Sequence, residues 1–492
     1  MKIRFNETRW FIWTILALCV GCFIFEITQI VQYAFQPNQM DYGEGFSMYI
    51  AKLWATGQFQ WNPSHQPYMT LIYGVIYPEI LKPFVLLFGP DLIIGRIYCL
   101  IATLIVAIFI FFIARRFSKN IIICLLAALI PMLQPSYREW IMQARCDMIA
   151  IMFSVIGVYI VIRWQSDKRV FWSIPLFLLA FFTKQTAVVG GCAACVYLWI
   201  SNRKISITYI SVLFASLTAI ILGGNVLTAG QFFKQLVDYN MVVPFAWPLN
   251  IVELNYEDIF FPFILILPLI IIILLSKRNI YKQYLIPLLW LVISAFVTCV
   301  LLFRSGGFIN YGMEFIIISG LCFSLLLEQV KNIHFKTTYI VIICLLIPTQ
   351  ILLSFSRNPI SMPDKAYDKA VIKVEEIIKN TEQPILTDNA GLVLNAGKTP
   401  YYEPVIYTNL EHFGYFNQNI IVGDLNNSRI DYLVFQQPVT ISNYNYTRFT
   451  PQVVDAIDSN YQIVYTYLTF SSGYQFCVYE SNTLYNAQHK SN

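Results

Sequence analysis

Residues 92–113, with the sequence LIIGRIYCLIATLIVAIFIFFI, decide the fold together with the basic residues Arg115, Arg116 and Lys119 that follow them. Arg96 is the only charged residue in the apolar run. A helix needs about 20 consecutive, mainly apolar residues to cross a bilayer. Basic residues beside a span stay in the cytoplasm. The stretch therefore predicts a membrane-spanning helix that ends at the cytoplasmic face.

The composition of the whole chain agrees with this interpretation. Of its 492 residues, 57% are hydrophobic and 12% are charged, whereas about 25% of the residues of an ordinary soluble domain are charged. An aromatic content of 16% excludes a disordered chain. The net charge of +5 comes without a dense run of Lys and Arg, which argues against a nucleic-acid partner. We therefore expect an integral membrane protein of the multi-pass class.

Apolar runs and basic clusters alternate along the first 355 residues, which form the predicted transmembrane module. Lys2, Arg4 and Arg9 precede the first run, so we expect a cytoplasmic N-terminus and a retained span rather than a cleaved signal. About eleven spans are predicted, at 10–30, 92–114, 120–136, 147–163, 170–184, 187–201, 206–224, 259–276, 284–303, 313–328 and 337–355. Sixteen basic residues fall in the predicted cytoplasmic segments of this module and eight fall elsewhere.

Residues 31–91 are predicted to form an outer loop with interfacial helices. The part from Tyr68 to Phe88 is semi-apolar, but two prolines, a glutamate and a lysine interrupt it, which argues against a span. If it did cross, the basic cluster after residue 113 would lie outside the cell, against the orientation rule. A helix that lies in the membrane interface fits both observations better.

Residues 356–492 are predicted to form a soluble α/β domain. Pro359, Pro363 and Asp364 mark its beginning, and residues 364–380 carry apolar side chains at helical spacing. Short strands are expected at 385–386, 432–435, 463–467 and 475–479. Because an odd number of spans precedes this domain and the first starts inside, we expect the domain on the extracytoplasmic side.

The strongest candidate for chemistry is the sequence DYGEG at 41–45, directly after the first predicted span. Asp41 and Glu44 place two carboxylates three positions apart, between glycines and beside the membrane surface. Such a pair serves as a general base or binds a cation. The alternative is an ordinary polar loop with a turn at one of the glycines.

Further charged residues fall on the same predicted outer face. Charges near a membrane are costly unless they are paired or solvated, so they indicate function by default. Structural alternatives remain for them, namely an ion pair between Arg145 and Asp147, a snorkelling Lys184 and helix caps at Arg304 and Glu314. The candidate residues are the charged Arg138, Arg145, Asp147, Lys184, Arg304 and Glu314, together with the uncharged Tyr311.

In this layout the chain resembles the GT-C glycosyltransferases, and among them the protein-O-mannosyltransferase and aminoarabinose-transferase group, which is like glycosyltransferase family 39. The resemblance rests on an ordered series of short motifs spread over most of the chain. They are Asp41 and Glu44, the segment 49–57, Phe88-Gly89 with Arg96, Ala144-Arg145-Cys146-Asp147, Thr183-Lys184-Gln185, Asn310-Tyr311 with Glu314, and Asp388 and Ala396-Gly397-Lys398 in the C-terminal part. Asp41 best matches the family's catalytic aspartate, although Tyr42 and Gly43 separate it here from the second acidic residue.

The resemblance implies an inverting glycosyltransferase of the plasma or inner membrane. It would move a sugar from a polyprenyl-phosphate-linked donor to a hydroxyl of a lipid, glycan or protein acceptor at the extracytoplasmic face. It implies Asp41 and Glu44 as the catalytic pair, with a divalent cation, if one is used, at the same two residues. The donor phosphate would be bound by Arg138, Arg145, Lys184 and Arg304, and the substrates by Tyr68, Asp147, Tyr311 and Glu314. Trp61, Tyr73 and the segment 239–247 are candidates for a sugar-stacking surface.

Two other classes of protein remain as alternatives. A transporter or flippase for a lipid-linked saccharide would also be polytopic, but it is expected to show inverted repeats and broken helices that meet at the midplane. An O-antigen-type polymerase or ligase would carry Arg and His on large outer loops. Neither pattern is evident here, where the acidic residues follow the first span.

Overall fold

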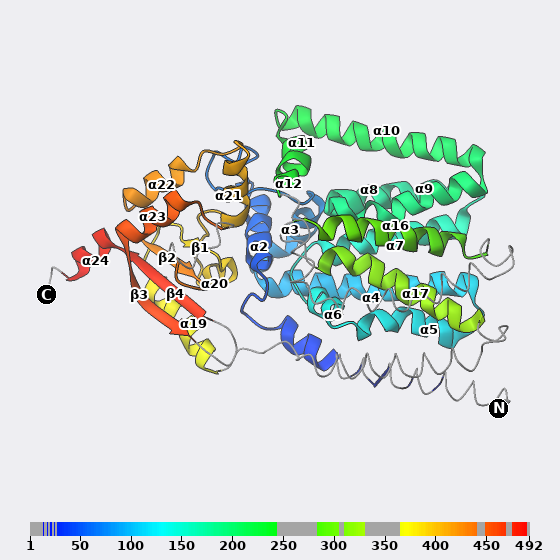
Figure 1. The fold of residues 1–492 in the computed structure, drawn as a ribbon, viewed down its shortest axis with the longest axis horizontal. Coiled ribbons are helices and arrows are strands. Elements are labelled where there is room, and N and C mark those ends of the chain that lie inside the picture. The colour runs from blue at the N-terminus through cyan, green and yellow to red at the C-terminus, as the bar shows by residue number, and fades with distance from the viewer. Residues whose placement is uncertain are drawn as a thin grey trace.

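The computed structural model describes residues 27–243, 283–304, 309–329, 365–439, 448–468 and 475–489, with scattered positions between 13 and 24. The long helices that precede residue 330 lie side by side along the long axis of the molecule, and the described residues from 365 onward form a separate lobe beside one end of them (Figure 1). Helices α2 (Tyr42–Ala55) and α3 (Ile76–Phe88) lie between these two parts.

Four of the described helices are long and apolar enough to cross a membrane. They are α4 (Leu92–Phe117), α7 (Asp147–Trp164), α10 (Arg203–Leu227) and α16 (Leu285–Leu302). Shorter apolar helices are α5 (Ile121–Leu129), α8 (Ser173–Thr183), α9 (Val189–Ser201) and α17 (Met313–Gln329). All of them coincide with predicted spans. The predicted spans 259–276 and 337–355, and most of 10–30, lie outside the described residues.

The short helices end where the backbone leaves the α-helical path. Helix α5 continues into a 3₁₀ turn, η1 (Ile130–Leu133), that contains Pro131, a residue that has no N–H for the helical ladder. Helix α8 stops at Lys184, whose backbone is extended, and the 3₁₀ turn η3 (Gln185–Val188) leads into α9. A short 3₁₀ segment, η2 (Lys168–Trp172), and a short helix, α6 (Pro135–Ile141), join the remaining elements.

Helix α4 is fixed at both ends by charged residues. The Asp91 carboxylate accepts a hydrogen bond of 2.8 Å from the backbone N–H of Ile93, which caps the N-terminus. Arg115 and Arg116 lie in the last turn, where positive charge is favourable to the helix dipole. In the first turn of this helix, a Cβ at Gly95 would lie 2.6 Å from that of Ala144. Glycine is therefore needed there to bring α4 against the loop before α7.

The segment 31–91 contains the two helices α2 and α3 rather than a span. Helix α3 has 13 residues and contains Pro83, and at 1.5 Å per residue it extends over only about 20 Å. Its last residues, Leu86, Leu87 and Phe88, are exposed and apolar, as expected for a helix that lies against lipid. Its position in the membrane interface stays a prediction.

Residues 365–489 form an α/β domain with a four-stranded sheet of order β1-β2-β4-β3. The strands are β1 (Leu386–Thr387), β2 (Tyr432–Phe435), β3 (Tyr461–Leu468) and β4 (Gln475–Ser481). Strands β1 and β2 are parallel and the other pairs are antiparallel. The predicted α/β class is confirmed, with β1 displaced by one residue and β3 longer than expected.

Helices cover both faces of this sheet, because its strands are apolar on both sides. Tyr432 and Val434 of β2 pack with α19 (Lys365–Ile378) and α20 (Ala390–Asn395). The alternate residues Leu433 and Phe435 pack on the other face, as the two-residue period of a strand requires. That face is covered by α21 (Pro404–His412), α22 (Asn419–Asn426) and α23 (Pro451–Asn460), and the chain ends in α24 (Asn482–His489).

Candidate functional site

A cavity of about 1410 Å³ lies between the membrane helices and the C-terminal domain. Asp41, Tyr73, Trp140, Arg145, Arg304 and Tyr311 line it from the membrane part. Glu403, Asn409, His412 and Arg448 line it from the C-terminal domain. The cavity thus gathers predicted site residues from four separate segments of the chain on one side, and a set of C-terminal residues on the other.

Asp41 lies at the N-terminus of α2 and is held from two sides. One carboxylate oxygen accepts a hydrogen bond of 2.7 Å from the backbone N–H of Gly43, which caps the helix. The same oxygen forms an ion pair with the Arg145 guanidinium. The side chain of Asp41 keeps 20% of its surface exposed. It is therefore oriented by its neighbours and still accessible from the cavity.

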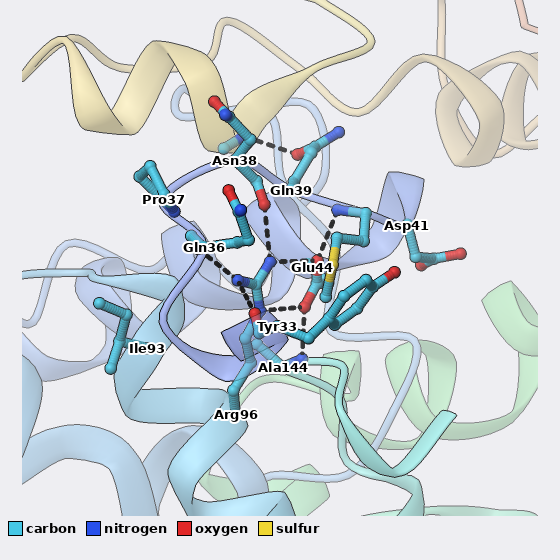
Figure 2. A network of polar contacts seen from close by, with 12 residues as sticks. Tyr33, Gln36, Pro37, Asn38, Gln39, Asp41, Glu44, Ile93, Arg96 and Ala144 are labelled. Carbon is cyan, nitrogen blue, oxygen red and sulfur yellow. Dashed lines mark hydrogen bonds and ion pairs between the residues drawn. The ribbon is translucent and has the colours of Figure 1, made fainter. Parts of the chain in front are cut away.

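Glu44, the second carboxylate of the motif, is fully buried and faces away from the cavity. Both of its oxygens accept hydrogen bonds of 2.9 Å from the Arg96 guanidinium. The backbone N–H groups of Met40 and Ala144 donate to the same two oxygens at 2.7 Å. Figure 2 shows this network, with the side chain of Asp41 pointing away from it. The four donors occupy the lone-pair positions that a carboxylate offers.

Arg96 connects this network to the loop that follows the first predicted span. Its guanidinium donates to the backbone carbonyl oxygens of Tyr33 at 3.3 Å, of Asn38 at 2.8 Å and of Gln36. These bonds lie in the protein interior, where Arg96 has no exposed surface. Glu44 and Arg96 together therefore fix the backbone that carries Asp41 (Figure 2).

Arg145 is the residue that joins Asp41 to the rest of the membrane side. Its second terminal nitrogen donates to the Tyr73 hydroxyl at 3.0 Å, and its Nε lies 3.7 Å from an Asp147 carboxylate oxygen. The guanidinium lies over the Trp140 ring, 5.1 Å from the ring centroid. The side chain is 12% exposed, so its charge acts in surroundings where electrostatic attraction is stronger than in water.

Lys184 and Asp147 form a second ion pair just behind the cavity wall. The Lys184 ammonium bonds to the Asp147 carboxylate, which also accepts a hydrogen bond of 3.1 Å from Asn310. The ammonium lies 4.7 Å from the ring centroid of Tyr311 and 5.4 Å from that of Tyr73. Lys184 therefore stands behind two aromatic rings that line the cavity.

The remaining predicted site residues divide into two groups. Arg304 lines the cavity and donates to the Asn240 side-chain oxygen at 3.0 Å and to the Asn240 backbone oxygen. Arg138, Tyr68 and Glu314 are not among the lining residues. Tyr68 packs on Tyr401, Tyr407 and Phe416 in the C-terminal domain. Glu314 accepts hydrogen bonds from Ser154 at 2.9 Å and Trp290 at 2.7 Å.

The C-terminal side contributes three charged residues that the sequence did not indicate, Glu403, Glu411 and Arg448. Arg448 forms an ion pair with the buried Asp388 and lies over the Tyr42 ring, 5.4 Å from its centroid. Burial raises the pKa of Asp388, and the Arg448 charge opposes that rise. Glu403 is 7% exposed. Burial raises its pKa to about 8, against the opposing influence of the Arg145 charge.

Asp41 and Glu44 are also the predicted cation ligands. Among the described parts of the chain, no three His, Cys, Asp or Glu side chains form a cluster that suits a metal ion. The Glu44 oxygens are already occupied by Arg96 and two backbone N–H groups. The geometry therefore leaves Asp41 as the only carboxylate of the pair that is available to a ligand.

The chain is similar to known proteins in part of its sequence and in its fold. Residues 75–226 match the family model described as dolichyl-phosphate-mannose-protein mannosyltransferase. No curated protein has a significant sequence match to the chain. Among solved structures, ArnT from Cupriavidus metallidurans bound to undecaprenyl phosphate is similar with a TM-score of 0.58 and 10% identity, over 94% of this chain and 99% of that one.

A second solved structure is similar over much of the chain. The Archaeoglobus fulgidus oligosaccharyltransferase, in a complex with Zn and sulfate, has a TM-score of 0.53 and 12% identity over 94% of this chain and 72% of that one. At such low identity the likeness concerns the fold. The chain therefore has the fold of the GT-C superfamily of membrane glycosyltransferases, and the predicted resemblance to this superfamily is confirmed.

Proposed function

We propose that this protein is an inverting glycosyltransferase that moves a sugar from a polyprenyl-phosphate-linked donor to a hydroxyl-bearing acceptor. One observation carries the proposal. Asp41 stands at the wall of a large cavity, accessible and held by Arg145, and Arg304 lines the same cavity. Sugar transfer from a phosphate needs a group that accepts the acceptor's proton and cations that stabilise the departing phosphate. A carboxylate can accept the proton, and guanidinium groups can stabilise the phosphate.

In the proposed reaction Asp41 is the general base. The acceptor hydroxyl attacks the anomeric carbon from the face opposite the phosphate, so the new carbon–oxygen bond forms as the bond to the phosphate oxygen breaks. The hydroxyl proton passes to the Asp41 carboxylate, and the bonding electrons leave with the phosphate. The anomeric configuration is inverted because there is a single displacement at this carbon.

The departing phosphate gains negative charge, and fixed cations stabilise that charge. Arg145 and Arg304 are our first candidates because both line the cavity, and a guanidinium matches phosphate geometry with two parallel hydrogen bonds. Lys184 acts from behind Tyr73 and Tyr311. Arg138 is the least favoured of the four predicted residues because it does not line the cavity.

We assign Glu44 a positioning role rather than that of the base. Its oxygens are occupied by Arg96, Met40 and Ala144, and it holds the loop that carries Asp41. Asp147 plays a similar part for Lys184. The proposal therefore needs one base and does not depend on a cation shared by Asp41 and Glu44.

The lipid donor is supported by the fold and by the apolar helices of the chain. The similar structure of ArnT contains undecaprenyl phosphate, and a chain with helices long and apolar enough to cross a membrane suits a donor that arrives from the bilayer. We place the cavity at the extracytoplasmic face of the plasma or inner membrane. The orientation of the basic clusters carries that placement.

The test uses the purified full-length protein in liposomes. It is incubated with a panel of polyprenyl-phosphate sugars and hydroxyl-bearing acceptors, and released polyprenyl phosphate is measured together with the anomeric configuration of the product. We expect release with the wild type and none with Asp41→Asn. Movement of intact lipid-linked sugar across the bilayer without release would instead indicate a transporter.

A further inference from the structure

Glu403 is a buried carboxyl group that the proposed reaction leaves without a task. It precedes α21 and has a side chain without a capping bond. It is 7% exposed and lines the cavity. Within the parts of the chain that the structure describes, no group is found to donate a hydrogen bond to its carboxyl oxygens. These oxygens are therefore available to a ligand in the cavity.

The backbone connects Glu403 closely to the proposed base. The N–H of Val405, two positions after Glu403, donates a hydrogen bond of 3.2 Å to the hydroxyl of Tyr42. Tyr42 directly follows Asp41 in the chain. The Arg448 guanidinium lies over the same tyrosine ring, and the Arg448 carbonyl accepts a bond of 2.9 Å from Thr408 on α21. These contacts therefore fix the position of this part of the C-terminal domain relative to Asp41.

The two sides of the cavity differ in chemical character. The membrane side presents Arg145 and Arg304, which suit an anion. The C-terminal wall, defined here as the lining residues of α21–α23 with Glu403, carries two acidic residues, Glu403 and Glu411, among other polar groups. The other polar groups include Thr408, Asn409, His412, Gln418 and Asn419. Arg448 also lines the cavity from the C-terminal domain, beside this wall. The wall itself offers hydrogen bonds and carboxyl groups, whereas the membrane side offers two guanidinium groups.

We propose that the C-terminal wall is the acceptor subsite and binds a hydroxyl-rich saccharide, with Glu403 hydrogen-bonded to a saccharide hydroxyl beside the attacking one. The inference rests on the proposed function. It narrows the acceptor from any hydroxyl to the hydroxyl of a glycan. Glu403 acts as a positioning and specificity residue, and Asp41 still takes the proton.

The chemistry of the C-terminal wall favours a saccharide over an alkyl chain. An alkyl chain satisfies none of the polar groups of the wall, including the Glu403 carboxyl group. Vicinal hydroxyls both donate and accept, and a neutral carboxyl group does the same. With its pKa raised to about 8 by burial, Glu403 is mostly neutral at pH 7.

The experiment compares two substitutions at one position. The full-length protein in nanodiscs, saturated with undecaprenyl phosphate, is titrated calorimetrically with cellotetraose, chitotetraose and mannotetraose. We expect at least one of these saccharides to bind to the wild type. Its affinity for Glu403→Leu should be at least tenfold lower than for the wild type. Its affinity for Glu403→Gln should be within threefold of the wild-type value, because the glutamine amide also donates and accepts hydrogen bonds. The control is Glu382→Leu, a change at an exposed glutamate of the same domain. The affinity for undecaprenyl phosphate should stay the same in all variants.

The outcomes separate this inference from the proposed function. Saccharide binding that depends on Glu403, without release of polyprenyl phosphate from any donor, supports the subsite and overturns the transferase. Release stimulated by a threonine peptide or by dodecanol, but by none of the saccharides, overturns the subsite and leaves the transferase standing. Equal saccharide affinity of Glu403→Leu and the wild type also overturns the proposed subsite.

A second measurement covers the case in which Glu403→Leu does not fold, which a loss of undecaprenyl phosphate binding would reveal. Wild-type protein is treated with a carbodiimide, which modifies protonated carboxyl groups, and the labelling of Glu403 is read by mass spectrometry. The tetrasaccharide that binds should protect Glu403, and undecaprenyl phosphate alone should not. Equal labelling with and without the saccharide contradicts the proposal.

Discussion

The Glu44 carboxylate and the Arg96 guanidinium form a buried pair joined by two hydrogen bonds of 2.9 Å. Neither side chain has exposed surface. Their remaining hydrogen-bonding positions are taken by backbone groups of the loop before α2 and of Ala144. The pair therefore joins α2, α4 and the loop before α7 at the point from which Asp41 projects (Figure 2).

Breaking this pair should be costly, and removing both charges should cost less than the two single changes together. Glu44→Gln or Arg96→Gln leaves one buried charge without its partner, a loss of about 3–5 kcal/mol in comparable pairs. A double-mutant cycle of thermal unfolding in detergent measures the coupling. The exposed pair Asp167 and Arg169 is the control, in which little coupling is expected. Additive losses at Glu44 and Arg96 would contradict the buried network.

Asp41→Asn should abolish sugar transfer and leave folding intact. Asparagine caps a helix about as well as aspartate, so α2 keeps its N-terminus, but the amide does not accept the acceptor proton. The measurement is release of polyprenyl phosphate, with thermal unfolding as the check on folding. Asp91→Asn is the matched control, since Asp91 caps α4 in the same way at an exposed position away from the cavity. Wild-type turnover by Asp41→Asn would remove it from the role of base.

The membrane helices and the α/β class were predictable because each depends on a local pattern of apolar residues. The candidate residues Asp41, Arg145 and Arg304 were predictable because charges near a membrane are rare. The partner of Glu44 was not, because Arg96 lies 52 positions away and nothing local to either residue indicates the pairing. The family resemblance favours Asp41 over Glu44, but the residue types alone do not distinguish them, and only the fold separates the accessible carboxylate from the buried one.

Glu403 and Arg448 were missed for a related reason. In sequence they are ordinary charged residues of a soluble domain, where charges are common. They acquire their position because α21 and the start of α23 face α2 across the cavity. A charge in an apolar segment is informative by itself, whereas a charge in a polar segment becomes informative only in three dimensions.

Lys184→Met should weaken both folding and donor use. The change leaves Asp147 buried with its closest cation removed, and only Asn310 at 3.1 Å and Arg145 at 3.7 Å remain. We expect a loss of stability and at least a tenfold weaker affinity for undecaprenyl phosphate, with acceptor affinity little changed. Arg169→Met, at an exposed ion pair, is the control. An unchanged donor affinity would exclude Lys184 from the phosphate site.

The orientation of the chain can be tested by cysteine labelling in intact cells. Ser459→Cys introduces a thiol at an exposed position of α23, and Lys119→Cys introduces one at an exposed position after α4. If the C-terminal domain is extracytoplasmic, a membrane-impermeant maleimide labels the first in intact cells and the second only after permeabilisation. The opposite pattern would invert the predicted topology and place the cavity at the cytoplasmic face.

The pH dependence of acceptor binding should report on Glu403. Burial raises its pKa to about 8, so the folded protein favours the neutral form of Glu403 below that pH. As the pH rises through about 8, the carboxyl group loses its proton and the neutral form is lost. The charged and titratable groups that act on it or are influenced by it are Arg145, Tyr42 and Tyr407. Glu411, His412 and Arg448 line the same cavity. Arg145 stays positive throughout, and burial raises the pKa of both tyrosines well above 10.

Above pH 8 the ionised Glu403 should be drawn to Arg145 and be less available to a saccharide hydroxyl. We therefore expect the acceptor KM to be constant from pH 6 to 7 and to rise severalfold by pH 9, with the donor KM unchanged. Glu403→Gln, which has no proton to lose, should keep the low KM across the whole range. A wild-type KM that rises in parallel with that of Glu403→Gln would assign the titration to another group.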